Sequence, residues 1–173
     1  GGHIGETTTM ALVPQVVDAV KIPVIAAGGI ADGRGIAAAF MLGAEAVQMG
    51  TRFVATQECN VHENYKQFVL KAKDIDTRVT GRTTGHPVRT LRNPMTKEYL
   101  EKEAAGASFE ELELLTLGGL RKAVVDGDVK TGSVMSGQIA GMVKDIPTCK
   151  DLMARLMAET KETVRKNSFL AEE

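Results

Sequence analysis

The sequence predicts an α/β fold, the C-terminal part of a (β/α)8 TIM barrel, with an added and mostly helical C-terminal region. Glycine-rich turns near His3, Gly28 and Gly50 recur every 22 to 25 residues, the spacing of one strand, one helix and two short loops. Short apolar runs precede the second and third turns. A barrel is favoured over an open doubly wound sheet, because its last loops commonly bind phosphate and residues 28–33 match the dinucleotide fingerprint poorly.

The first elements follow from apolar runs and proline. Residues 14–20 are expected to form a short helix with Pro14 in its first turn. Residues 23–27, PVIAA, form an apolar run that suits a strand buried on both faces. Gly28 and Gly29 end this run and permit backbone dihedrals that other residues avoid. The sequence therefore predicts a strand that leads directly into a flexible turn.

The second strand-helix unit has clearer boundaries. Asp32 is the expected N-cap of a helix through residues 36–42. A second strand over residues 45–49 then ends in Gly50 and Thr51. Two neighbouring parallel strands thus end in turns whose backbone N–H groups are free to bind an anion. We interpret this pair of turns as the binding site of a phosphorylated cofactor.

Beyond Phe53 the sequence becomes mostly helical. The expected elements are a helix capped by Asn60 through Lys73, extended segments within 77–92, a helix from Asn93-Pro94 to near Gly106, a helix with a Ser108/Glu111 capping box, a short segment 121–125 and a final helix 148–166. The small residues of segment 133–144 fit either a helix packed on the barrel or direct cofactor contact. We expect residues 1–55 to hold the last strand-helix repeats and residues 56–173 to form a helical lid of the same domain.

Composition excludes several classes of function. The net charge is −1 and no basic, aromatic-rich stripe is visible, so nucleic-acid binding has no electrostatic basis. No apolar run approaches the length of a membrane span. Cys59 and Cys149 lie 90 residues apart without a CxxC pattern, so we predict two reduced thiols and no metal site.

Six motifs together carry a family resemblance. They are GGHIG, IPVIAAGGIADG, GAEAVQMGTRF, NVHENYK, GHPVR and GSVMSGQIAG, in this order along nearly the whole chain. With these motifs the chain resembles the FMN-dependent enoyl-acyl-carrier-protein reductases of bacteria, the FabK type. It is similar, more loosely, to their relatives the nitronate monooxygenases. The threonine-rich stretch after GGHIG is more similar to the reductases.

The resemblance implies an enzyme of fatty-acid elongation in the bacterial cytoplasm. It implies FMN as cofactor, NAD(P)H as co-substrate, a monovalent cation as a further ligand, a trans-2-enoyl thioester of acyl carrier protein as substrate, and a homodimer. A complete barrel needs about 250 residues, and only two complete strand-helix repeats can be recognised in this sequence. We therefore expect this chain to be the C-terminal part of a longer protein, inactive without the first part of its barrel.

The residue on which the chemistry depends is His3. It lies between Gly2 and Gly5, in a loop expected at the mouth of the barrel, where an imidazole can donate or accept a proton near neutral pH. The resemblance implies that His3 orients the thioester or takes part in protonating its α-carbon, and that Gly2 and Gly5 lie against the flavin. In the nitronate relatives the matching histidine removes an α-proton.

The remaining candidate residues follow the phosphate turns and the GHPVR motif. The backbone N–H groups of Gly28, Gly29, Gly50 and Thr51 are expected to hold the FMN phosphate, and the Thr51 hydroxyl is expected to add a hydrogen bond.

Gln48 and Met49 end the second strand and are assigned to cofactor binding, although Gln48 equally suits a hydrogen-bonded amide of the core. Arg52 adds charge at the turn or pairs with a carboxylate. His86 and Arg89 either contact the NAD(P)H or pantetheine phosphate or brace the helical region.

Two other readings stay open. A nitronate monooxygenase shares the fold, the flavin and the histidine position, and differs in its substrate and electron donor. A non-catalytic fragment that binds FMN or phosphate predicts binding without turnover. An IMP-dehydrogenase-like barrel is disfavoured, because it needs a cysteine near the second phosphate turn and residues 45–56 contain none.

Overall fold

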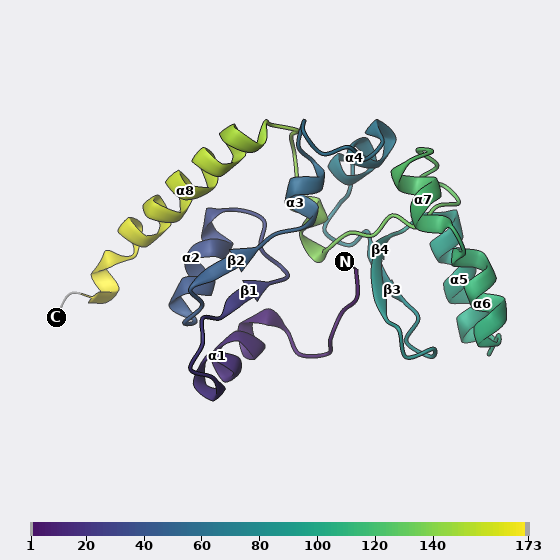
Figure 1. Cartoon of the computed structure of the whole chain (residues 1–173), viewed down its shortest axis with the longest axis horizontal. Helices are drawn as coiled ribbons and strands as arrows, with labels where there is room; N and C mark the ends of the chain where they lie inside the picture. The colour runs from purple at the N-terminus through teal and green to yellow at the C-terminus, as the bar shows by residue number, and fades with distance from the viewer. Residues whose placement is uncertain (1, 172–173) are drawn as a thin grey trace.

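The computed structural model describes residues 2–171. Figure 1 shows two lobes on either side of the N-terminal segment. We call α1, β1, α2, β2 and α8 the strand-helix lobe, and β3, β4 and α4 to α7 the hairpin lobe. The elements are α1 Thr9–Ala19, β1 Ile25–Ala27, α2 Gly33–Met41, β2 Ala46–Gln48, α3 Thr51–Val54, α4 Glu63–Leu70, β3 Thr77–Thr80, β4 Val88–Leu91, α5 Pro94–Ala104, α6 Phe109–Thr116, α7 Gly119–Val124, η1 Gln138–Met142, α8 Cys149–Lys166 and η2 Ser168–Ala171.

The strand-helix lobe is built on two parallel strands. β1 pairs with β2 in the register Ile25 to Ala46 through Ala27 to Gln48. The intervening α2 is the crossover that a parallel pair requires. As predicted, Asp32 caps α2, and its carboxylate accepts hydrogen bonds from the N–H groups of Arg34 and Gly35. This arrangement is the repeating unit of a (β/α) barrel.

Two expectations for this lobe were wrong. Helix α1 begins at Thr9, so Pro14 lies inside the helix and not in its first turn. The carbonyl of Thr8 accepts hydrogen bonds from the N–H groups of Ala11 and Leu12, which starts the helix earlier than proline alone suggests. β1 is not buried on both faces: Ala26 is buried, whereas Ile25 is 61% exposed.

The hairpin lobe contains an antiparallel pair within the stretch that was expected to be extended. β3 pairs with β4 from Thr77 opposite Leu91 to Thr80 opposite Val88. The free edge of β4 is shared by two distant segments. His3 bridges to Val88, and Met135 bridges to Thr90. The N-terminal loop is therefore fixed to the hairpin and not to the strand-helix lobe, as Figure 1 shows.

Local capping explains the helices of this lobe. Asn93 caps α5, with Pro94 in its first turn, and Ser108 and Glu111 form the predicted capping box of α6. The prediction for α4 was wrong, because the cap is His62 and not Asn60. The Nδ1 atom of His62 accepts a hydrogen bond of 3.1 Å from the backbone N–H of Asn64.

Helix α8 returns the chain to the strand-helix lobe. It begins after its N-cap Thr148 and packs along α2, burying Leu152 and Leu156. Other apolar side chains of α8 are only partly covered, because Met153 and Met157 are about half exposed. Segment 133–144 does not form the expected α-helix. It runs extended beside β4 and contains only the 3-10 helix η1.

Three apolar clusters hold the structure together. One lies within the strand-helix lobe, a second joins α3, α4, β4 and η1, and a small third cluster lies between α5 and α6. The second cluster contains both Ala31, which follows the β1 turn, and Tyr65 of α4, so it connects the two lobes. Across residues 2–171 no helix combines the length and apolarity that crossing a membrane requires.

Candidate functional site

The predicted phosphate turns lie side by side at the ends of β1 and β2. Gly28 and Gly29 have φ values of 101° and 75°, the left-handed region that glycine tolerates. Within residues 2–171, the backbone N–H groups of Gly28, Gly29, Gly50 and Thr51 donate to no protein acceptor. Free N–H groups of two adjacent turns are what binding of a phosphate requires.

By contrast, the N-terminus of α2 is already occupied by carboxylates of the protein. Asp32 accepts from two N–H groups, and the Oε2 atom of Glu159 accepts from the N–H of Gly33 at 3.0 Å. An anion at this helix end would meet two negative side chains. The available anion site is therefore the pair of turns and not the N-terminus of α2.

The side chain of Thr51 has a partner that the sequence did not predict. Its Oγ1 accepts a hydrogen bond of 2.9 Å from the N–H of Gly137. The hydroxyl proton remains available for a phosphate oxygen. This bond ties the small-residue segment 133–137 to the second phosphate turn.

An unpaired hydroxyl lies next to this connection. The Oγ atom of Ser136 is buried and has no hydrogen-bond partner within the described residues. Buried polar atoms in folded proteins almost always have a partner. An orphan hydroxyl beside Gly137, together with the free N–H groups of the turns, fits a site that is completed by a polar, phosphorylated cofactor.

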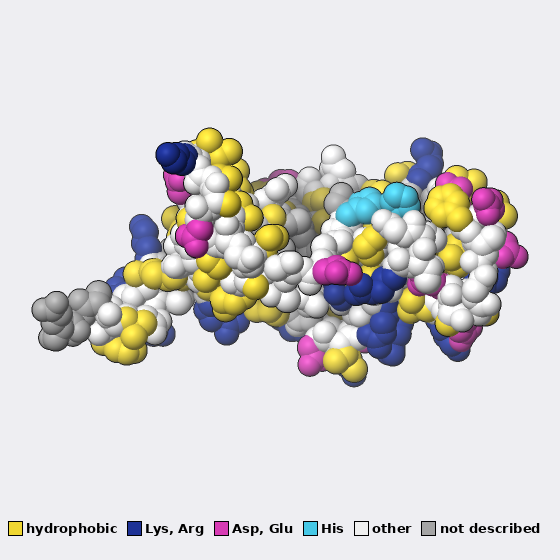
Figure 2. Space-filling view, turned by 90° about the horizontal axis from the view of Figure 1, so that it is seen from below, with side chains coloured by type: hydrophobic (Ala, Val, Ile, Leu, Met, Phe, Trp, Pro, Cys, Tyr) yellow, Lys and Arg dark blue, Asp and Glu magenta, His cyan; other side chains and the backbone are white. Residues whose placement is uncertain are grey.

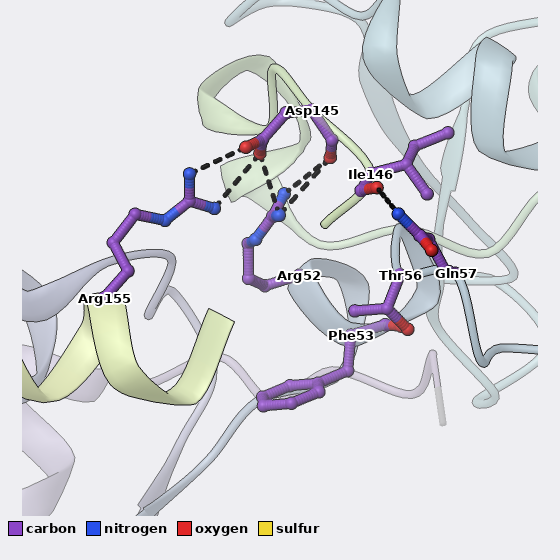
Figure 3. A network of polar contacts seen from close by, with 7 residues as sticks. All are labelled: Arg52, Phe53, Thr56, Gln57, Asp145, Ile146 and Arg155. Atoms are coloured by element: carbon purple, nitrogen blue, oxygen red, sulfur yellow. Dashed lines mark hydrogen bonds and ion pairs between the residues drawn. The ribbon is translucent and has the colours of Figure 1, made fainter. Parts of the chain in front are cut away.

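Arg52 follows the phosphate turn and is fixed by an ion-pair network (Figure 3). Its guanidinium donates 2.9 Å to Oδ1 of Asp145 and 3.2 and 3.3 Å to the backbone carbonyl of Asp145. Arg155 of α8 also binds the carboxylate, at 2.6 and 3.2 Å. Burial lowers the pKa of Arg52, and the attraction of Asp145 opposes that shift. Of the two expectations for Arg52, the structure shows pairing with a carboxylate.

His3 is exposed and lies at a cavity of the hairpin lobe. The cavity measures ≈ 300 Å³ and is lined mainly by apolar surface. Gly2 adjoins His3 with a φ of 108°, and a side chain at this position would overlap the sulfur of Met135. Met135 is held in turn by Tyr65, whose hydroxyl donates to its carbonyl at 2.5 Å; burial raises the pKa of this tyrosine.

The structure separates the two polar residues of the GHPVR motif. His86 lines the same cavity as His3. Arg89 lies on the opposite face of the hairpin, because its strand neighbours Val88 and Thr90 line the cavity. Its guanidinium donates 3.1 Å to Oγ1 of Thr77. They do not form one cluster.

The other predicted contact residues lie as follows. Gln48 is exposed in this chain. Met49 is partly buried against the apolar cluster of the strand-helix lobe. Gly5 is exposed, and an added Cβ there would meet no atom within 4 Å.

Figure 2 shows histidine side chains gathered on one face of the molecule, next to apolar side chains. Within residues 2–171, no group of three or more His, Cys, Asp or Glu side chains is arranged to hold a metal ion. The polar groups that sequence reasoning missed, Ser136, Asp145 and Arg155, come from the last third of the chain. Of these three, only Ser136 lies in the small-residue segment 133–144, and no sequence signal indicated Asp145 or Arg155.

Two parallel strands joined by a helix, paired turns with free N–H groups and an exposed histidine loop define part of a (β/α) barrel. The chain belongs to the nitronate monooxygenase family, which it matches over residues 1–159. The predicted α/β barrel class is thereby confirmed.

Among solved structures, FabK from Thermotoga maritima is 53% identical with a TM-score of 0.92, over 98% of this chain and 54% of that one. A probable nitronate monooxygenase of Staphylococcus aureus is 42% identical over 80% of this chain and 42% of its own length.

A third relative, from Rhodococcus jostii, is named (3aS,4S,5R,7aS)-5-hydroxy-7a-methyl-1-oxo-octahydro-1H-indene-4-carboxyl-CoA dehydrogenase. It is 34% identical over 92% of this chain and 56% of its own length. The chain thus spans about half the length of the relatives it matches.

Proposed function

We propose that the protein containing this chain reduces the double bond of a trans-2-enoyl thioester carried by acyl carrier protein, with NAD(P)H as electron donor and FMN as bound cofactor. The observation that carries this proposal is the identity of 53% to a FabK structure, extending over 98% of the chain. The bacterial cytoplasm, a homodimer and a monovalent cation are further parts of the proposal.

Each part of the chain has a role in this reaction. The free N–H groups of Gly28, Gly29, Gly50 and Thr51 would hold the FMN phosphate. Bound FMN supplies hydride transfer from the nicotinamide to the β-carbon of the substrate. The imidazole of His3, exposed beside an apolar cavity, would orient the thioester carbonyl or deliver a proton to the α-carbon.

The test compares two reactions in the full-length protein loaded with FMN. Oxidation of NADH or NADPH is followed without oxygen in the presence of a trans-2-enoyl thioester, and consumption of an alkyl nitronate is followed in air. The proposal expects enoyl-dependent oxidation of the nicotinamide and its loss in His3→Ala. Glu6→Ala is the matched control, because Glu6 is exposed in the same loop and does not line the cavity.

The family match favours one alternative. A nitronate monooxygenase would use the same turns for FMN and the same imidazole of His3 as the base that removes the α-proton of the substrate. It predicts nitronate-dependent oxygen uptake that needs no nicotinamide. If only this reaction occurs, the reductase proposal is wrong.

A further inference from the structure

We propose that the cavity beside His3 is the binding pocket for the acyl chain of the substrate, and that Met95 at its closed end limits the chain length. This inference rests on the proposed function, because it assigns the apolar part of the same substrate. It adds a site and a specificity-determining residue in the hairpin lobe, outside the turns that would hold the cofactor.

The chemistry of the lining indicates an apolar ligand. Several hydroxyls that line the cavity already have protein partners. Thr84 donates to a backbone carbonyl at 3.0 Å, Thr116 donates to another at 3.2 Å, and the hydroxyls of Thr90 and Thr96 lie 3.3 Å apart. A polar ligand would therefore offer these hydroxyls no additional stabilisation, because their hydrogen bonds are already formed. An alkyl chain, which needs no hydrogen bond, fits a cavity that is lined mainly by apolar surface and in which these hydroxyls are already paired.

The acidic and imidazole side chains of the lining are exposed, whereas the phenol of Tyr99 belongs to a buried residue. His3, His86 and Glu113 line the cavity and are exposed. His86 packs edge to face against Phe109, with ring centroids 6.5 Å apart. A ligand would therefore place its polar thioester at the rim near His3 and its hydrocarbon tail inside.

The direction of the cavity follows from the register of β4. His3 bridges to Val88, and Thr90 lies two residues farther along the same face, about 6.6 Å away. Beyond it, Met95 and Tyr99 of α5 line the cavity and are 7% and 6% exposed. The lining thus extends from the exposed imidazole of His3 to the buried side chains of α5, which we assign as the closed end of the cavity.

The volume sets the size of the ligand. A cavity of ≈ 300 Å³ holds about ten groups of methylene size, if each takes the roughly 30 Å³ of a water molecule in the liquid. Medium-length acyl chains would fill the cavity. Shorter chains would leave part of the apolar lining in contact with water, which weakens their binding.

Two substitutions of opposite sign at Met95 test the proposal. Met95→Trp fills the closed end, and Met95→Ala extends it. The full-length protein loaded with FMN is assayed with crotonyl, decenoyl and tetradecenoyl thioesters. Each buried methylene contributes about fourfold in affinity, so Met95→Trp should lower the decenoyl-to-crotonyl ratio of kcat/KM by about tenfold or more. Met95→Ala should raise the tetradecenoyl-to-decenoyl ratio.

The matched control is Met157→Trp. Met157 is 46% exposed on α8 in the other lobe. The kcat/KM ratios of Met157→Trp should therefore stay within about twofold of wild type, which is less than the effect of burying one methylene group. Calorimetric titration with butyryl- and decanoyl-pantetheine, saturated compounds that cannot be reduced, measures the pocket without turnover.

The outcomes separate the two proposals. If decanoyl-pantetheine binds more tightly than butyryl-pantetheine and Met95→Trp removes this difference, the pocket is supported even when no enoyl thioester is reduced. If affinity does not depend on chain length, or if both Met95 variants keep the wild-type ratios, the acyl pocket is refuted while enoyl reduction can still hold.

Discussion

Asp145 pairs with two arginines, the buried Arg52 and the more exposed Arg155. Removing the charge of Asp145 should lower the stability of the protein more than removing the charge of Arg155. The side chain of Arg52 is 5% exposed, whereas those of Arg155 and Asp145 are 41% and 47% exposed. In Asp145→Asn the buried guanidinium of Arg52 keeps the backbone carbonyl of residue 145 as acceptor but loses its counter-charge. A hydrogen bond to a charged group contributes about 1.5 to 3 kcal/mol, and half exposure of the carboxylate reduces this, so we expect a loss of about 1 to 2 kcal/mol.

Arg155→Gln should cost less than about 1 kcal/mol, because an exposed ion pair contributes little. Denaturant unfolding of the full-length protein and its variants measures both losses. The double variant should show coupling, since both arginines bind the same carboxylate. If Asp145→Asn costs no more than Arg155→Gln, the buried guanidinium does not depend on this counter-charge and the reasoning fails.

The same network predicts a dependence on pH. The hydrogen bond from Arg155 and the charges of both arginines hold the pKa of Asp145 below its usual value. A carboxylate whose folded-state pKa is lowered stabilises the protein above its unfolded-state pKa, and this contribution disappears as the pH falls through the folded-state pKa. Wild type should therefore lose more stability than Asp145→Asn on acidification below about pH 4. Parallel acid unfolding curves would contradict this.

Two further predictions concern the packing of α2 on α8 and the second phosphate turn. Gly33→Ala should cost about 1 to 3 kcal/mol, because the new methyl group would overlap Glu159 and the backbone of Thr160 and push α8 from α2; Gly50→Ala, which meets no atom within 4 Å, should leave the unfolding free energy nearly unchanged. Thr51→Val should weaken FMN binding more than riboflavin binding in fluorescence titrations, because it removes the hydroxyl that we propose donates to the FMN phosphate; equal losses for both flavins would refute that role.

Capping explains why many boundaries could be predicted from the sequence. Asp32, Asn93, Ser108 and Thr148 each accept a hydrogen bond from an N–H two or three residues later. Such bonds depend only on neighbouring residues, so the sequence pattern contains them. The cap of α4 escaped prediction, because the acceptor is the ring nitrogen of His62 and not an asparagine side chain.

Long-range partners could not be read from the sequence in the same way. The pairing of His3 with Val88 joins residues far apart in the chain. Arg52 and Asp145 are 93 residues apart. The prediction that β1 is buried on both faces was wrong, because Ile25 is exposed. The burial of Ile25 depends on residues outside its own strand-helix unit, which a local sequence pattern does not contain. The turns could be predicted from neighbouring residues, whereas the side chains that lie beside them are placed by contacts between residues far apart in the sequence.

The most direct test of the central claim is rapid mixing of the FMN-loaded, full-length protein without oxygen. The flavin is first reduced by the nicotinamide donor and then mixed with a decenoyl thioester, and its absorbance is followed. The account predicts fast reoxidation that becomes much slower in His3→Ala. If the reduced flavin does not react with the thioester but is reoxidised only by dioxygen, the protein is not an enoyl reductase.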